Sequence, residues 1–92
     1  MIDFPAPRVL NRAYLQVLLE SGPMSHSEAC AKVALLLNLS KDQLSLMQDD
    51  RRKKFDFRMA WAKSGLKDKG FISVKDKTVK ITSAGEDFLS SN

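Results

Sequence analysis

Three pairs of a serine and a glutamate or glutamine three residues later stand at the start of a helical pattern, and these pairs constrain the fold more than any other feature of the sequence. The pairs are Ser25 with Glu28, Ser40 with Gln43, and Ser83 with Glu86. In such a capping box the serine hydroxyl accepts a hydrogen bond from an amide of the first helical turn, and the longer side chain reaches back to the amide of the serine. We therefore expect short helices to begin after residues 25, 40 and 83 of this 92-residue chain.

Apolar residues at helical spacing define the elements of the amino-terminal half. A first helix is predicted over about residues 8–20, a second over about 26–37, and a short third over about 40–47. The side chains expected to point inward from these helices are Leu10, Tyr14, Val17, Leu18, Ala29, Val33, Leu36, Leu37, Leu44 and Met47. Residues 1–7 contain two prolines and no periodicity, so we expect an extended lead-in before one domain of residues 8–92.

A fourth helix, predicted over about residues 53–69, has an apolar face and a basic face. At 100° per residue its core face comprises Phe55, Met59, Ala62 and Leu66. Phe57 and Trp61 form a separate i,i+4 pair on a flank of this helix. We expect Trp61 to be a core residue rather than a platform for stacking bases, because it pairs with Phe57 and not with other exposed aromatic residues.

Two runs rich in β-branched residues, 71–74 and 78–82, follow the fourth helix. Lys75-Asp76-Lys77 separates them, which predicts a β-hairpin with a charged tip. A last helix would then place Phe88 and Leu89 against the core. Three helices, a long helix, a hairpin and a last helix together predict a mainly α fold with a small β-hairpin, a winged helix-turn-helix.

Net positive charge is confined to the segment from residue 51 to residue 80. This segment has eleven lysines and arginines against three aspartates, a net charge of +8, whereas residues 1–50 and 81–92 each have a net charge of −2. Such a segment is typical of a surface that binds phosphates, although a solvated lysine-rich face has the same composition. The candidate DNA-binding residues are Arg51, Arg52, Lys53, Lys54, Arg58, Lys63, Ser64, Lys67, Lys75, Lys77 and Lys80.

These candidates fall into groups with different expected roles. The cations of residues 51–54 cluster where a helix begins, a position that the helix dipole disfavours, so phosphate contact is a reason to keep them there. Lys63, Ser64 and Lys67 lie on the outward face of the fourth helix, where they could reach base edges or the backbone in the major groove. The wing lysines could follow phosphates or enter the minor groove. Arg58 is expected to stack on the neighbouring tryptophan, bind a helix end or contact DNA.

Several other classes of protein are disfavoured by the sequence. No apolar run approaches the roughly 18 residues needed to span a bilayer, and the amino terminus lacks the apolar stretch of a signal peptide, so we expect a cytoplasmic protein without membrane contact. The single cysteine, Cys30, is expected to be a buried, inert thiol. The sequence has no glycine-rich phosphate loop, no metal-ligand cluster around His26 and no ordered Ser-His-Asp set, so we expect neither a cofactor, a metal nor an enzymatic activity.

Short motifs in the carboxy-terminal half point to a family. The motifs are Phe57-Arg58-Met59-Ala60-Trp61-Ala62, Leu66, Gly70-Phe71 and Ile81-Thr82-Ser83-Ala84-Gly85. Over about residues 8–89 the chain resembles the amino-terminal domain of Mrr-type, modification-dependent restriction endonucleases. That family shows an arginine, a Trp-Ala pair and a leucine before a helix end, and its wing closes with a Thr-x-x-Gly turn.

The resemblance implies a winged-helix module that binds double-stranded DNA and delivers a carboxy-terminal nuclease domain to its target. These 92 residues contain neither such a domain nor an Asp-x-Lys or Glu-x-Lys triplet of a nuclease site, so we expect any cutting residues to lie outside them. Two alternatives stay open: a stand-alone transcription regulator with the same fold, and a winged helix that mediates protein contacts, including a homodimer, through its basic face. The recognised sequence or base modification is not defined by the residues.

Overall fold

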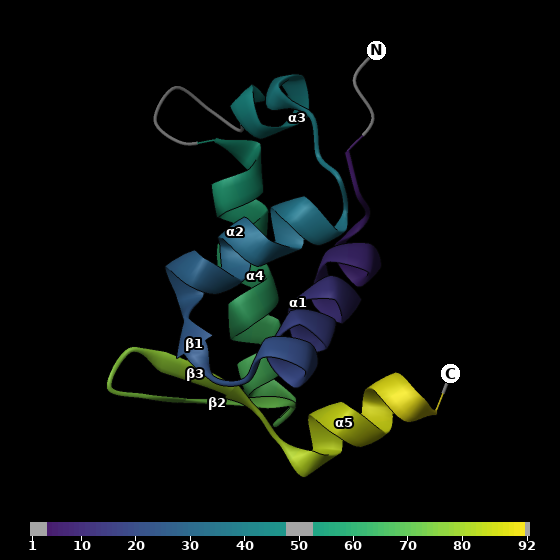
Figure 1. Ribbon diagram of the computed structural model, residues 1–92, viewed down its shortest axis with the longest axis vertical. Coiled ribbons are helices and arrows are strands. Elements are labelled where there is room, and N and C mark those ends of the chain that lie inside the picture. The colour runs from purple at the N-terminus through teal and green to yellow at the C-terminus, as the bar shows by residue number, and fades with distance from the viewer. Residues whose placement is uncertain (1–3, 48–52, 92) are drawn as a thin grey trace.

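The computed structural model describes residues 4–47 and 53–91, which form five helices and three short strands (Figure 1). The helices are α1 (Pro7–Ser21), α2 (His26–Leu36), α3 (Lys41–Ser45), α4 (Lys54–Asp68) and α5 (Ser83–Ser90), and the strands are β1 (Met24–Ser25), β2 (Ile72–Lys75) and β3 (Thr78–Ile81). The fold is mainly α with a small antiparallel sheet, as predicted, and it is winged-helix-like. No helix in the described part of the chain has the length and apolar character required to cross a bilayer.

Local capping contacts explain where two of the helices begin. Ser25 accepts a hydrogen bond from the backbone amide of Glu28 at 3.2 Å, so α2 starts at the predicted residue. At Ser40 both halves of the capping box form: its hydroxyl accepts the Gln43 amide at 3.1 Å, and its own amide donates to Gln43 Oε1 at 2.7 Å. α3 is shorter than predicted and ends at Ser45.

The junction between the wing and α5 corrects the third predicted cap. Thr82, not Ser83, caps α5: its hydroxyl accepts the amide of Gly85 at 3.2 Å and donates to the carbonyl of Gly70 at 2.6 Å. Thr82 can do this because its backbone is still extended, whereas Ser83 is already the first helical residue. A side chain at Gly85 would collide with the carbonyl oxygen of Phe71, so the Thr-x-x-Gly turn packs the start of α5 against the base of the wing.

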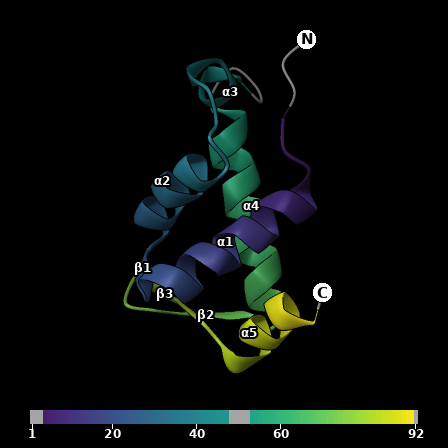
Figure 2. The same cartoon turned by 45° about the vertical axis from the view of Figure 1, so that its right-hand side comes forward.

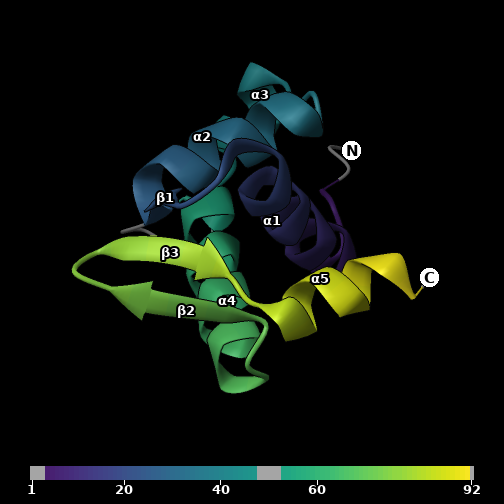
Figure 3. The ribbon, with the colours of Figure 1, turned by 60° about the horizontal axis from the view of Figure 1, so that its bottom comes forward.

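The sheet has the strand order β1-β3-β2 and contains one strand that was not predicted (Figure 3). β1 has only two residues, too few to show a periodicity, and both pair antiparallel with β3. Met24 pairs with Val79, and Ser25 pairs with Thr78. This pairing ties the tip of the wing to the start of α2.

α1 lies at the centre of the domain, and α2, α4 and α5 pack against it (Figures 1 and 2). The buried core consists of Leu10, Ala13, Tyr14, Leu15, Val17 and Leu18 of α1, Met24 of β1, Ala29 and Val33 of α2, Phe55, Met59, Ala62 and Leu66 of α4, and Ile72, Val79 and Ile81 of the sheet. The predicted core faces of α1 and α4 are thus confirmed, and Leu37, Leu44, Phe88 and Leu89 are partly buried against this core.

Two residues that were predicted to point inward are exposed. Leu36 is 48% exposed and Met47 is 50% exposed. Leu36 is the last residue of α2, and Met47 lies beyond the end of α3. The reasons differ: Leu36 lies at the edge of the face of α2 that packs against the core through Ala29, Val33 and Leu37, whereas Met47 is no longer helical, so helical spacing does not place it.

Candidate nucleic-acid interface

α4 presents three surfaces to its surroundings, because only one of its faces is buried. At 100° per residue, Asp56, Lys63 and Lys67 lie on one side of the core face, which we call the α2 flank. Arg58 lies on the other side, toward α1, which we call the α1 flank. Phe57 and Trp61 stand between the two flanks, opposite the core, and form what we call the aromatic ridge. The predicted site residues of α4 are therefore distributed over different surfaces.

The α2 flank brings Lys63 to the start of α2. Burial lowers the pKa of His26, the first residue of α2, and the nearby positive charge of Lys63 lowers it further, while Asp56 opposes the change. Lys63, which was predicted on the outward face of the helix, is partly buried. Lys67 follows one turn later and is exposed. The free amides at a helix N-terminus attract anions, so Lys63 and the start of α2 favour the same kind of ligand.

A hydrogen-bonded chain of side chains lies beneath this flank. The Tyr14 hydroxyl is 2.8 Å from His26 Nδ1, and Cys30 Sγ is 3.5 Å from His26 Nε2. Burial raises the pKa of Tyr14, so its hydroxyl keeps its proton. The hydroxyl donates to Nδ1 in the tautomer that carries its proton on Nε2 and accepts from Nδ1 in the other tautomer. Burial also raises the pKa of Cys30 to about 11. The thiol, which is partly buried, is therefore protonated and unreactive at neutral pH.

The wing carries three lysines, and its strand β3 pairs with β1, the short strand that precedes α2 (Figure 3). Alternate residues of β2 and β3 face the core, so Lys75 and Lys80 are exposed on the outer face of the sheet. Lys77 is at the tip, where it and Asp76 have positive φ angles of 65° and 50° in a turn without glycine. Because Thr78 pairs with the N-cap residue of α2, the tip of the wing and Lys63 approach the same helix terminus.

The cations at the start of α4 lie at the opposite end of this helix. α4 has 15 residues, so its ends are roughly 22 Å apart. Lys53 is the N-cap residue and is exposed, whereas Lys54 Nζ stands 5.3 Å from the centroid of the Phe4 ring, a cation–π contact that gives this lysine a structural partner. Arg51 and Arg52, which were also predicted to contact DNA, lie outside the described residues.

The prediction that Trp61 is a core residue is wrong. Its side chain is 64% exposed, whereas Met59 and Leu66 on the core face of the same helix are 0% and 2% exposed. The contact with Phe57 does form, edge to face, with ring centroids 6.1 Å apart. An i,i+4 pair requires two side chains to meet, but it does not require another element to cover them.

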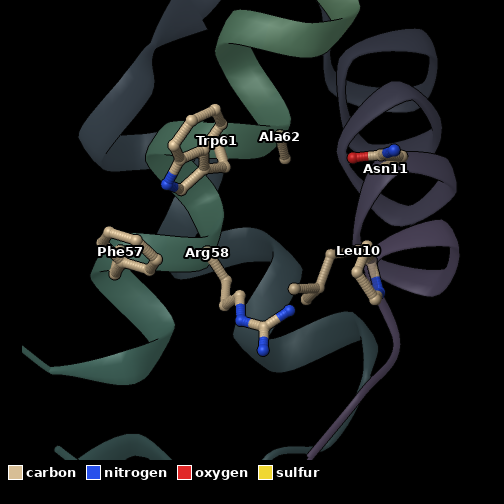
Figure 4. A pocket seen from close by; sticks show the side chains of 7 residues that line it. Leu10, Asn11, Phe57, Arg58, Trp61 and Ala62 are labelled. Atoms are coloured by element: carbon tan, nitrogen blue, oxygen red, sulfur yellow. The ribbon is translucent and has the colours of Figure 1, made fainter. Parts of the chain in front are cut away.

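Arg58 extends from α4 toward α1 and lines a hollow between the two helices (Figure 4). This hollow has a volume of about 430 Å³, and its walls include Leu10 and Asn11 of α1 and Trp61 and Ala62 of α4. The Nε of Arg58 is buried and has no hydrogen-bond partner among the described residues. Neither the predicted stacking on the tryptophan nor a bond to a helix end is found for Arg58 in that part of the chain.

A second, smaller hollow adjoins the aromatic ridge. It has a volume of about 210 Å³ and is lined by Phe57, Ala60, Trp61 and Ser64. Ser64 is exposed, in agreement with an outward position, but it lies with the aromatic side chains rather than with the lysines of the α2 flank. The ridge therefore borders two hollows.

Sequence reasoning missed the parts of this surface that come from other helices. Nothing in the spacing of Leu10 and Asn11 indicates that they meet Arg58, and nothing in the sequence indicates that His26 lies beside Lys63. The position of Trp61 around the helix axis was the one available signal of its exposure, because this position lies far from the core face. Within residues 4–47 and 53–91, no three metal-ligating side chains gather closely enough to hold a metal ion.

α4, the small sheet and the cations around them define a winged-helix-like domain of mainly α architecture. Comparison with protein families matches residues 9–91 to the Mrr N-terminal domain, and the chain belongs to this family. The match covers nearly the whole chain and confirms the resemblance carried by the motifs of α4 and the wing. Comparisons with curated proteins and with solved structures found no match.

Proposed function

We propose that this domain binds double-stranded DNA and thereby targets an Mrr-type restriction endonuclease to its substrate. One observation carries the proposal: Lys63 of α4 lies near His26 at the start of α2, and the wing, which carries three lysines, pairs through Thr78 with Ser25, the N-cap residue of α2. The chain belongs to the Mrr N-terminal domain family, and this membership supports a role in a restriction system. On this proposal the residues that cut DNA belong to another part of the parent protein.

The balance of charge on this surface suits the phosphates of a duplex. Lys67 on α4 and the three wing lysines are exposed, and the acids on this surface are Asp56 on the α2 flank, Asp76 at the wing tip and Glu28 in the first turn of α2. An α-helix fits the major groove, and a wing beside it can reach the phosphates that border the groove. Each lysine that meets a phosphate releases condensed counterions, which makes binding favourable at low salt.

Different parts of the surface have different proposed roles. Lys63, Ser64 and Lys67 project from α4 and would meet base edges or the walls of the groove. Lys53 and the wing lysines lie at the two ends of the surface and would contact phosphates. Lys54 is expected to contribute less, because its ammonium group already lies over the ring of Phe4.

A fluorescence anisotropy titration with a labelled duplex tests the proposal. We expect binding with a dissociation constant in the micromolar range or weaker, and a linear fall of log K with log salt between about 50 and 200 mM, with a slope of about −0.9 for each phosphate contact. Parallel titrations with methylated and unmethylated duplexes measure any preference for modified bases. Affinity that does not change with salt would show that these cations do not bind phosphate.

A protein contact is a second candidate function, and exposed apolar side chains on α1 and α2 favour it. Val9, Leu19, Leu35 and Leu36 are 43%, 45%, 80% and 48% exposed. Val9 and Leu36 line a hollow of about 320 Å³ together with Leu89 of α5. A second copy of the chain would bury these side chains. Sedimentation equilibrium tests this function, and a monomer at every protein concentration would contradict it.

A further inference from the structure

Phosphate binding does not account for the aromatic ridge of α4, because its two side chains carry no positive charge. Trp61 is 64% exposed, so most of a large apolar side chain is in contact with water, where it gains nothing from burial. The hollows of about 430 and 210 Å³ both reach the ridge and both are lined by Phe57 and Trp61. The indole is therefore accessible to a ligand that enters either hollow.

The larger hollow combines apolar walls with hydrogen-bonding groups (Figure 4). Leu10, Ala62 and the ridge supply the apolar surface, and Arg58 and Asn11 supply the polar groups. A guanidinium offers donors in one plane, and an amide offers a donor and an acceptor. The volume falls within the roughly 300–1,000 Å³ that is typical of small-ligand sites. These features suit a flat ring whose edge carries hydrogen-bond acceptors.

The surroundings of the ridge favour a nucleic acid over a protein as the source of that ring. α4 has four cations against two acids, and Arg58 lies between the two aromatic residues of the ridge in sequence. The cations are Lys54, Arg58, Lys63 and Lys67, and the acids are Asp56 and Asp68. Single-stranded nucleic acids bind where aromatic side chains stack with bases and nearby cations hold the backbone. The centre of a protein interface is instead depleted of charged residues.

We propose that Trp61, Phe57 and Arg58 form a binding site for an unpaired nucleobase. The base stacks on the indole, Arg58 and Asn11 hydrogen-bond to its edge, and the lysines of α4 hold the adjacent phosphates. This inference deepens the proposed DNA-binding function and rests on it. It identifies the preferred substrate as DNA in which a base has left the helical stack, at a bulge, at a mismatch or in a single strand.

Trp61 is the only tryptophan of the chain, so its fluorescence reports directly on this site. Three probes separate the base from the backbone: a paired duplex, the same duplex with one bulged thymine, and the same duplex with an abasic residue as the bulge. We expect the thymine bulge to quench Trp61 and to bind roughly 5- to 150-fold more tightly than the other two, as expected for stacking of one base. The abasic bulge should neither quench the fluorescence nor gain affinity.

Variants separate a stacking role from a structural one. Trp61→Ala should keep the melting temperature and the affinity for the paired duplex but lose the preference for the bulge, measured by anisotropy. Trp61→Phe should restore part of that preference, and Arg58→Gln should weaken it. Leu35→Ala is the matched control, because it removes another exposed apolar side chain, on α2, and should leave the preference unchanged.

The outcomes distinguish this inference from the proposed function. If paired and bulged duplexes bind equally and Trp61 is not quenched, the base-binding site is wrong and duplex binding stands. If the paired duplex does not bind, but single-stranded DNA quenches Trp61 and does not bind Trp61→Ala, duplex binding is wrong and the base-binding site stands. If no DNA binds, both are wrong, and loss of self-association in Trp61→Ala would assign the ridge to a protein interface.

Discussion

The two flanks of α4 belong to one helix but differ in the kind of ligand that they suit. The α2 flank combines Lys63 and Lys67 with the wing and the start of α2, so charge dominates there. The α1 flank combines Arg58 with the aromatic ridge and a hollow, so shape and stacking dominate there. The comparison shows how a helix with a single buried face can present two chemistries, one for the DNA backbone and one, on our proposal, for a base.

The largest difference expected between buried and exposed parts of α4 is in stability. Met59→Ala should lower the free energy of unfolding by about 2 to 5 kcal/mol, because it leaves a cavity at a fully buried position. Trp61→Ala should change it by no more than about 0.5 kcal/mol, because the side chain is mostly exposed. Urea unfolding followed by circular dichroism measures both. Equal losses of unfolding free energy in the two variants would show that Trp61 is a core residue.

A smaller effect, a dependence of stability on pH, tests the packing beneath the α2 flank. Burial and the charge of Lys63 lower the pKa of His26, so the folded protein favours the neutral imidazole while the unfolded chain titrates near the ordinary value of 6.5. The unfolded chain therefore binds more protons just below pH 6.5. The stabilisation is complete above that pH and is lost as the pH falls toward the lower pKa of the folded state.

The measurement is the free energy of unfolding at pH values of about 7.5 and 5.5, on either side of the histidine titration. His26 is the only histidine of the chain, and the charged or titratable groups that act on it or contact it are Tyr14, Cys30, Asp56 and Lys63. His26→Asn should flatten the dependence. Stability that rises on acidification would show that the imidazole is protonated in the folded protein.

The sequence was sufficient for features that depend on local contacts. Helix starts at Ser25 and Ser40 were predicted because a cap and its partner are three residues apart. The core face of α4 was predicted because a helix repeats its face at a fixed angle. The confinement of net positive charge to residues 51–80 could be read from the sequence directly.

Features that depend on distant segments could not be predicted in the same way. β1 exists because two residues pair with the wing, and the hollow that Arg58 lines depends on where α1 passes α4. The capping role of Thr82 depends on the extended end of β3, which the Ser83 pattern does not reveal. The basic segment is divided among the wing, two ends of α4 and two flanks, so a net charge alone does not define the binding surface.

The salt dependence of duplex binding in matched lysine variants tests most directly whether the α2 flank and the wing meet phosphates. Lys77→Ala and Lys80→Ala each remove one exposed wing lysine, and Lys32→Ala removes the same charge from α2, beside Leu35. We expect the slope of log K against log salt to become shallower by about 0.9 for each wing variant and by about 1.8 for both together, and to stay at the parent value for Lys32→Ala. An equal change in the wing and control variants, or no change in any, would contradict the account.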